Sequence, residues 1–209
     1  MKFVKVLLNE NTKIVKLKMT ESEKKYAAAA LQVFKRFGVR KATMEEIALE
    51  AGVSKPTLYA TFRNKDQALA ATIRLAKEAA VETVRTSWQG ADSLDRKLDL
   101  FFERLVVAGY DLLHNSPDAD AFENAIGEFS GQAISATRKL EAELLAEAFS
   151  AHPAIANHGA TPEQYATFVV TAAMQAKRQS NSRTDLLAFL SALKLSVLAV
   201  AGENESADV

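Results

Sequence analysis

The fold is decided by residues 43–65, which read TMEEIALEAGVSKPTLYATFRNK. Thr43 and Glu46 have the spacing of a capping box, which predicts that a short helix begins there. Gly52 suits the left-handed conformation that ends a helix and turns the chain. Ser54 is a preferred helix-capping residue, so the sequence predicts a second short helix directly after a tight turn.

The apolar residues of this segment have the pattern needed to hold two short helices together. Ala48 is small where the helices should cross, and Val53 and Leu58 are apolar where the second helix should contact the first. This is the plan of a helix-turn-helix, whose second helix enters the major groove of DNA. The segment therefore predicts binding to double-stranded DNA.

Helical patterns extend in both directions from this segment. Upstream, Thr20 and Glu23 form another capping box, which opens an amphipathic helix that carries Phe34 and ends at Gly38. Downstream, the apolar spacing predicts helices over about 64–88, 93–115, 122–130, 133–149, 162–178 and 185–201. The sequence thus predicts an all-α fold.

Composition agrees with a helical chain and narrows its class. The 209 residues include only eight glycines, four prolines and no cysteine, so disulfides and thiolate metal sites are excluded. No secretory signal is visible, and we expect a cytoplasmic protein. The longest apolar stretch, Leu186–Ala201, is shorter than the ~20 residues that span a bilayer and contains Lys194. It is interpreted as a buried helix, with no membrane partner.

Charge is distributed unevenly although the formal net charge is zero. Residues 1–65 contain 14 lysines and arginines and six acidic residues, a net charge of +8. Residues 66–209 contain 12 basic and 20 acidic residues, a net charge of −8. The asymmetry favours an anionic partner for the front half alone, and the alternative is an uneven surface charge without a partner.

Three groups of residues place the central segment in a longer pattern: Phe34-(x)3-Gly38, then Thr43-(x)3-Ile47-Ala48-(x)2-Ala51-Gly52-Val53-Ser54, then Thr57-Leu58-Tyr59-(x)2-Phe62-(x)2-Lys65. Over about residues 21–75 the chain resembles the N-terminal domain of the TetR family of transcription regulators. The resemblance implies a three-helix DNA-binding domain joined by a long fourth helix to a C-terminal helical domain that binds a ligand and dimerises.

Four segments follow from these patterns. Residues 20–66 are the expected DNA-binding domain, and residues 67–202 are the expected effector-binding and dimerisation domain. Residues 1–19 differ in composition from the rest and are interpreted as an arm or a non-native extension. Residues 203–209 are acidic and are expected to be a disordered tail.

The resemblance also implies which residues contact DNA. Thr57 and Tyr59 would donate hydroxyl hydrogen bonds to phosphates, which fix the register without reading the sequence. Pro56 stands where the family more often has glycine, and Ala60 stands where a larger polar side chain is common. Base reading therefore shifts toward Lys55 and Thr61. The full DNA-contact set is Thr43, Lys55, Pro56, Thr57, Tyr59, Ala60, Thr61 and Lys65.

The last two expected helices have apolar stripes that need cover on several sides, which favours a second subunit. The resemblance implies a dimer interface made by both helices as a four-helix bundle, and a two-fold dimer suits a palindromic operator. The alternative is an ordinary monomeric core. The interface candidates are Tyr165, Phe168, Val169, Ala172, Leu186, Leu190, Leu193 and Val197.

The helices between residues 93 and 149 would enclose any effector. Aromatic and apolar residues in this region suit an apolar ligand, although such residues at helical spacing also form ordinary cores. Polar candidates to orient a ligand are Arg104, His114 and Glu128. The pocket candidates are Trp88, Phe101, Phe102, Leu105, Tyr110, Phe122, Phe129 and Met174.

The sequence therefore predicts a homodimeric DNA-binding regulator, expected to be a repressor that a small apolar effector releases from its operator. Activation in place of repression stays open, and no cofactor or metal is expected. One alternative is a dimeric DNA-binding protein without an effector. A small all-α enzyme is the other, which the dispersed His114, His152 and His158 and the lack of a catalytic motif disfavour.

Overall fold

The computed structural model of the chain describes residues 19–115 and 131–203, and every regular element in those ranges is a helix, as the sequence predicts. In chain order the elements are α1 (Glu21–Lys41), α2 (Met44–Ala51), α3 (Lys55–Thr61), α4 (Lys65–Ser87), the 3₁₀ turn η1 (Trp88–Gly90), α5 (Leu94–Phe101), the π-helix η2 (Phe102–Val107), α6 (Ala108–Asn115), α8 (Gly131–Phe149), the 3₁₀ helix η3 (Pro153–His158), α9 (Pro162–Gln179) and α10 (Arg183–Ala201).

Helix starts follow the capping residues that the sequence displays. Thr20 with Glu23, Thr43 with Glu46, and Thr161 with Gln164 all form complete capping boxes, in which each side chain satisfies the other residue's backbone N–H. Serines 54, 93 and 182 cap α3, α5 and α10 through single hydrogen bonds.

Three helix boundaries differ from the sequence prediction. Gly38, expected to end the first helix, instead forms a kink at φ 76°, and one further turn follows it to Lys41. The expected single helix over 93–115 is interrupted by η2, whose wider turns the apolar spacing did not indicate. Pro153–His158, expected as a loop, forms η3. The helix expected over 122–130 lies outside the described residues.

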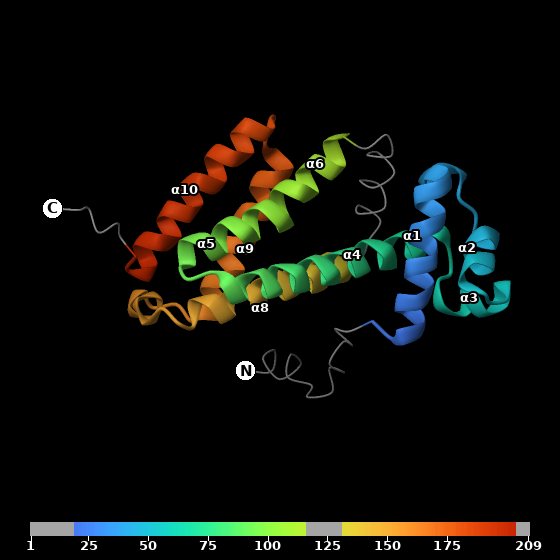
Figure 1. The fold of residues 1–209 in the computed structure, drawn as a ribbon, viewed down its shortest axis with the longest axis horizontal. Helices are drawn as coiled ribbons and strands as arrows, with labels where there is room; N and C mark the ends of the chain where they lie inside the picture. Colours follow the sequence, from blue (N-terminus) through green and yellow to red (C-terminus); the bar gives the residue numbers. More distant parts are fainter. Residues whose placement is uncertain (1–18, 116–130, 204–209) are drawn as a thin grey trace, which may run out of the picture.

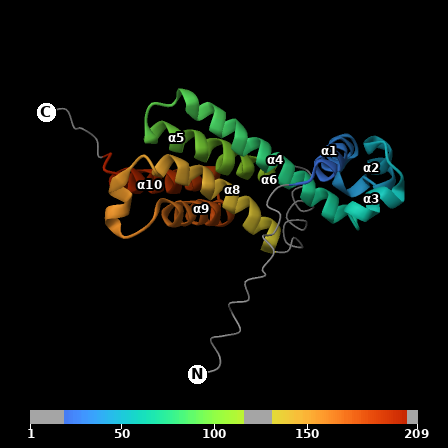
Figure 2. The same cartoon turned by 90° about the horizontal axis from the view of Figure 1, so that it is seen from below.

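Two separate hydrophobic clusters organise the described chain, and α4 joins them. The first contains Phe34, Ile47, Leu58 and Phe62 from α1 to α3, together with Leu69 from the first turns of α4. The second begins with Val81 and Val84 later in α4 and continues through α5 to α10. Figures 1 and 2 show α4 running without a break from the α1–α3 group into the larger helical body.

Helix α10 is less covered than the sequence interpretation requires. It is long and apolar enough to cross a membrane by length and composition alone, but packed helices of globular proteins pass the same test. Only 28% of its most apolar stretch is buried within this single chain. Leu186, Leu190 and Val197 face the core, whereas Leu195 is 60% exposed. The helix that the sequence interpretation expected to be buried is therefore largely exposed in the single chain.

Candidate DNA-binding surface

The turn between α2 and α3 is built by backbone hydrogen bonds around Gly52. Gly52 has φ 66° and ψ 39°, a left-handed conformation that other residues adopt at a cost. Its N–H donates to the Leu49 carbonyl at 3.1 Å, and the Val53 N–H donates to the Ala48 carbonyl at 3.0 Å. The Ser54 hydroxyl then accepts from the Thr57 N–H at 3.3 Å and starts α3. These bonds fix the direction in which α3 leaves α2.

The inner face of the motif is packed by apolar side chains. Ile47 and Leu58 are fully buried, and Ala48 is almost so. Phe62 meets Tyr26 of α1 edge to face, with ring centroids 6.5 Å apart. Tyr26 is thus the core tyrosine of this domain, whereas Tyr59 is 42% exposed. Tyr59 is therefore a surface residue and not part of this core.

The opposite face of α3 is open to solvent, and it carries most of the expected DNA contacts. Residues 55–57, 59 and 60 are exposed, as is Thr43 at the start of α2, while Thr61 and Lys65 are half-buried. Six of the eight expected residues therefore lie on the solvent-facing side of one compact motif. An exposed α3 face of this kind can enter a DNA groove without rearrangement of the domain.

Several of these side chains already have partners within the protein. The Lys55 Nζ lies 2.5 Å from the Glu45 carboxylate, and this hydrogen bond and charge hold the pKa of Glu45 below its usual value. The Thr57 and Ser54 hydroxyls lie 2.7 Å apart. A DNA phosphate must therefore compete with Glu45 for the Lys55 ammonium.

Lys65 has a structural contact that the sequence did not indicate. Its ammonium donates to the Arg40 carbonyl at 3.1 Å and so ties the start of α4 to the end of α1. Two exposed basic residues beside the motif, Lys41 and Arg63, were missed by the sequence analysis. Their positions in the sequence could have identified them, because Lys41 precedes the α2 cap and Arg63 lies between α3 and α4.

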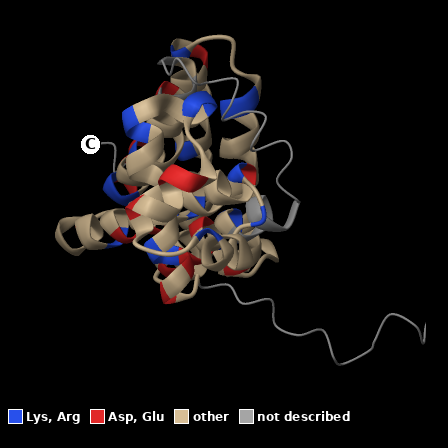
Figure 3. Cartoon of the chain, turned by 90° about the vertical axis from the view of Figure 1, so that its right-hand side faces the viewer, with Lys and Arg blue, Asp and Glu red and all other residues tan. Residues whose placement is uncertain are grey.

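The charge of the described N-terminal domain is positive but mixed. Residues 19–65 contain nine lysines and arginines and five glutamates, so about half of the excess positive charge counted in residues 1–65 lies in the residues before 19. Figure 3, with the N-terminal domain toward the viewer, shows basic and acidic segments interspersed. Local contacts, more than a uniform positive field, must therefore position a nucleic acid here.

The expected effector-pocket residues lie mostly in the packed core. Phe101, Phe102, Leu105 and Tyr110 are buried in the second cluster, as is Met174. Trp88 is half-buried, and its indole N–H donates to the Lys97 carbonyl at 3.0 Å. Phe122, Phe129 and Glu128 lie outside the described residues, and Arg104 and His114 are exposed.

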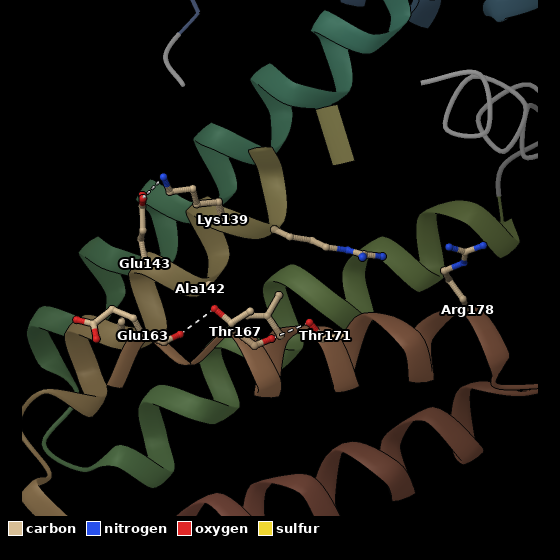
Figure 4. Close-up of a pocket in the computed structure, with 10 residues that line it drawn as sticks. Lys139, Ala142, Glu143, Glu163, Thr167, Thr171 and Arg178 are labelled. Carbon is tan, nitrogen blue, oxygen red and sulfur yellow. Dashed lines mark hydrogen bonds and ion pairs between the residues drawn. The ribbon is translucent and has the colours of Figure 1, made fainter. Parts of the chain in front are cut away.

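A groove of about 680 Å³ lies between α8 and α9, and none of the expected pocket residues lines it. Its lining is mainly apolar in area and also carries charged residues of both signs, with Lys139 and Glu143 3.9 Å apart on α8 and Glu163, Thr167 and Thr171 along α9 (Figure 4). The threonine hydroxyls donate to carbonyls one turn back in their own helix. The groove is thus open to solvent, and charged side chains of both signs lie beside its apolar lining.

The expected dimer residues fall into two groups in the structure. Val169, Leu186, Leu190, Leu193 and Val197 are buried within the protomer, and Tyr165 and Ala172 are half-buried. Phe168 is 59% exposed, next to Tyr165, with stacked rings 6.0 Å apart. Exposed apolar area on these helices also comes from Leu187, Phe189 and Leu195, which the sequence analysis did not name.

A cap-turn-cap motif with a packed inner face and an exposed second helix defines a helix-turn-helix DNA-binding protein. Residues 27–72 match the family model described as bacterial regulatory proteins of the tetR family. This part of the chain is therefore similar to the DNA-binding region of that family of bacterial transcription regulators.

Solved structures share the fold over nearly the whole chain. A TetR-family transcriptional regulator from Pectobacterium atrosepticum is 17% identical, with a TM-score of 0.54, and the match covers 87% of this chain and 97% of that one. The transcriptional regulator FadR from Bacillus subtilis, solved in complex with stearoyl-CoA, is 18% identical with a TM-score of 0.51, covering 85% and 97%. No curated protein is significantly similar in sequence to this chain.

Proposed function

We propose that this regulator is a cytoplasmic homodimeric repressor that leaves a palindromic operator when a small effector binds its C-terminal domain. The observation that carries the proposal is the continuity of α4. Lys65, at its first residue, is bonded to the end of α1 beside the DNA-binding motif. Val81 and Val84, four turns later, are buried in the second hydrophobic cluster. A shift of packing in that cluster therefore moves the DNA-binding domain without an intervening flexible linker.

Each DNA-binding domain would place α3 in a major groove. The hydroxyls of Thr57 and Tyr59 would donate to phosphates and set the register. Lys55, released from Glu45, would reach a phosphate or a base edge, and Ala60 would contact a thymine methyl group. Two domains related by a two-fold axis would read half-sites about one helical turn, ~34 Å, apart.

The dimer would form through the exposed face of α10. Ala188, Ala192, Leu195 and Ala199 are spaced by four, three and four residues, so they lie along one side of the helix, and all four are exposed. Small residues at this spacing permit close approach of a second helix, and the neighbouring Phe168 on α9 adds apolar area. This face replaces the buried residues Leu186, Leu190 and Val197 as the centre of the expected interface.

The effector would bind among the helices behind α4. The FadR structure supports a small-molecule effector only at the level of the fold, since that protein holds stearoyl-CoA. Two ion pairs join α4 to α8 in this chain, Lys77 with Glu141 and Arg85 with Glu147. A ligand that moves α8 or its partners would therefore act on α4 directly.

The proposal is tested by selection of bound duplexes from a random-sequence DNA library, followed by binding titrations at several salt concentrations. An inverted repeat is the expected product of selection. Tyr59→Phe should weaken binding about five- to tenfold with an unchanged salt slope, because it removes a neutral hydrogen bond. Lys55→Ala should lower the slope by about one, since it removes one phosphate contact.

The matched control is Lys139→Ala, which removes an exposed lysine of α8 far along the chain from the motif. It should leave both affinity and salt slope unchanged. Selection of no specific sequence, or loss of affinity equal to that of Lys55→Ala in the control, would exclude the proposed mode of binding. A selected palindrome whose binding no small molecule alters would favour the alternative, a dimeric DNA-binding protein without an effector.

A further inference from the structure

A cluster of charged residues lies inside the C-terminal domain, where α4, η2, α8 and α9 meet. Glu141 of α8 is 2% exposed and, with Thr72, is one of two buried polar residues in the described chain. The Lys77 ammonium donates to the Glu141 carboxylate at 2.7 Å and to the Leu105 carbonyl of η2 at 3.1 Å. Lys77 therefore joins three elements through a single ammonium group.

A second lysine, Lys177 of α9, completes the cluster. It is half-buried, it is repelled by Lys77 and it is attracted by Glu141. Within the described part of the chain it has no hydrogen bond or ion pair of its own. Glu141 is paired with Lys77 alone, so the two lysines and the glutamate together carry one positive charge in excess.

Such an excess is costly inside a protein. A buried charge is tolerated when it is paired, and an unpaired one is expected to shift its pKa toward the neutral form. Burial, with repulsion from Lys77 as the second cause, lowers the pKa of Lys177 from 10.5 to about 8. Near neutral pH the Lys177 side chain is therefore still charged, and its burial destabilises the folded protein.

Lys194 of α10 shows how the same fold pairs a partly buried lysine. Its ammonium lies 2.9 Å from Asp95 and 2.8 Å from Asp99, both on α5. Hydrogen bonds and attraction from the two carboxylates outweigh burial, so the pKa of Lys194 is raised. The lysine of α10 is supplied with two carboxylates, whereas Lys177 is attracted by a carboxylate that pairs with Lys77.

Helix α6 leaves space for the Lys177 ammonium. A Cβ atom on Gly109 would lie 2.7 Å from the Lys177 Nζ, closer than real side-chain carbons approach. Only a glycine admits the ammonium at this place without a shift of the lysine. The charged end of Lys177 is therefore accommodated by the α6 backbone rather than neutralised by it.

We propose that Lys177 is the anchor for an anionic group of the effector, a carboxylate or a phosphate carried on an apolar body, and that Lys77 shares in binding it. One anion would balance the surplus charge of the cluster. This inference rests on the proposed effector-released repressor and specifies the chemistry of its ligand, since the expected apolar effector acquires a charged end.

The same contacts connect the anion to α4. An anion that draws the Lys77 ammonium away from Glu141 would weaken one of the two ion pairs between α4 and α8. It would also loosen the bond from Lys77 to the Leu105 carbonyl of η2. Because Lys77 lies on the helix that begins at Lys65, binding of the charged group changes the support of the DNA-binding domain.

The experiment compares anions with neutral molecules of the same shape by thermal shift of the full-length protein. The probes are octanoate, benzoate and inorganic phosphate, and octan-1-ol and benzyl alcohol are the neutral partners. At least one anion is expected to raise the melting temperature of the wild type at concentrations at least tenfold below those its neutral partner needs. Lys177→Met should raise that anion's half-saturating concentration at least tenfold, and Gly109→Ala should raise it several-fold.

Lys139→Met is the control, because Lys139 lines the surface groove between α8 and α9. An anion response that disappears in Lys139→Met and persists in Lys177→Met would assign the anion to that groove and overturn the inference. Equal responses in wild type and Lys177→Met, equal responses to anion and alcohol, or no response to any of the three anions would overturn it as well.

The assay contains no DNA, so this inference and the proposed function fail separately. An absent anion response with intact recognition of a palindrome removes only the anion site. Lys177-dependent anion binding without any specific DNA recognition removes only the repressor. Release of the selected DNA by the same anion, lost in Lys177→Met, supports both.

Discussion

The two hydrophobic clusters differ in the kind of polar residue that is buried beside each of them. The buried polar residue of the N-terminal cluster is Thr72, a neutral group whose hydroxyl donates to the Ala27 carbonyl at 3.2 Å or the Ala68 carbonyl at 2.9 Å. Its counterpart in the C-terminal domain is Glu141, a charged group that lies among two lysines. The Thr72 hydroxyl finds its partners among backbone carbonyls. The charges around Glu141 do not balance, because two lysines face one carboxylate.

The two domains therefore differ in where their charged groups lie: at the surface in the N-terminal domain, and partly in the interior in the C-terminal domain. The N-terminal domain carries its lysines at the surface, where Lys55 is half-exposed and water screens the repulsion between like charges. The C-terminal domain holds charged groups in its interior, where an unbalanced charge lowers stability. Changes to individual side chains can measure this contrast.

The largest expected effect comes from Glu141→Ala. It leaves the ammonium groups of Lys77 and Lys177 without the carboxylate that attracts both, and removal of one partner of a buried ion pair costs about 3–5 kcal/mol. Urea denaturation measures the free energy of unfolding, and Glu143→Ala, an exposed site on the same helix, should change it by less than about 0.5 kcal/mol. Equal losses in the two variants would contradict the expected cost of removing the buried carboxylate from beside two lysines.

Lys177→Met is expected to stabilise the protein. At pH 7 both the folded and the unfolded chain carry the proton, so the folded state bears the full cost of the buried charge. Methionine removes that charge, and the free energy of unfolding should rise by on the order of 1–3 kcal/mol. Between pH 8 and 10.5 the folded wild type releases its proton first, so its own stability rises with pH.

The gain from Lys177→Met over wild type should therefore be full below pH 8 and shrink toward zero by about pH 10.5. Chemical denaturation of both proteins across this range gives the difference directly. A gain that does not depend on pH would show that methionine acts through better packing and not through the removed charge.

Gly52→Ala tests the N-terminal side of the comparison, where stability depends on backbone geometry. A Cβ at Gly52 would meet nothing within 4 Å, so the cost is that of the left-handed conformation alone, about 1–2 kcal/mol. Gly90→Ala is the matched control, because a Cβ there also meets nothing and its φ is not positive. Thermal unfolding should separate the two variants by several degrees, and equal melting temperatures would contradict the turn geometry.

Lys194→Met should give the smallest change, with a sign opposite to that of Lys177→Met. It removes partly exposed ion pairs to Asp95 and Asp99, which contribute about 0.2–1 kcal/mol. Because the pKa of Lys194 is raised in the folded state, this stability is present below pH 10.5 and lost as pH rises through the folded pKa. Denaturation at pH 7 and pH 11 checks both the sign and the loss.

Features that depend on a few neighbouring residues could be predicted from the sequence. The capping boxes at Thr20, Thr43 and Thr161 and the turn at Gly52 are all local, because each links residues at most five apart. The exposure of Tyr59 and the burial of Leu58 follow from helical spacing within the same motif. The local geometry of the α2–α3 motif could therefore be predicted from the sequence, whereas its contacts with DNA stay a prediction.

Features that depend on distant contacts could not be predicted. Glu141 stands in the sequence LEAELL and looks like any solvated glutamate, since its partners Lys77 and Lys177 lie 64 and 36 residues away. In α10 nearly every position is apolar, so the spacing does not tell the exposed Leu195 from the buried Leu190. The π-helix η2 likewise has no signature in the apolar spacing of its own segment.

That π-helix also sets the angular phase of the chain that follows it. A π turn accommodates one residue more than an α turn, and one residue corresponds to about 100° of rotation around an α-helix. With a regular α-helix through 102–107, all of α6 would be turned by roughly that angle. Gly109 would no longer face Lys177, and Asp111 would leave Arg183, which it meets at 3.1 Å. Deleting a single residue from this segment should therefore convert it to a regular α-helix and leave Gly109 and Asp111 facing the same partners.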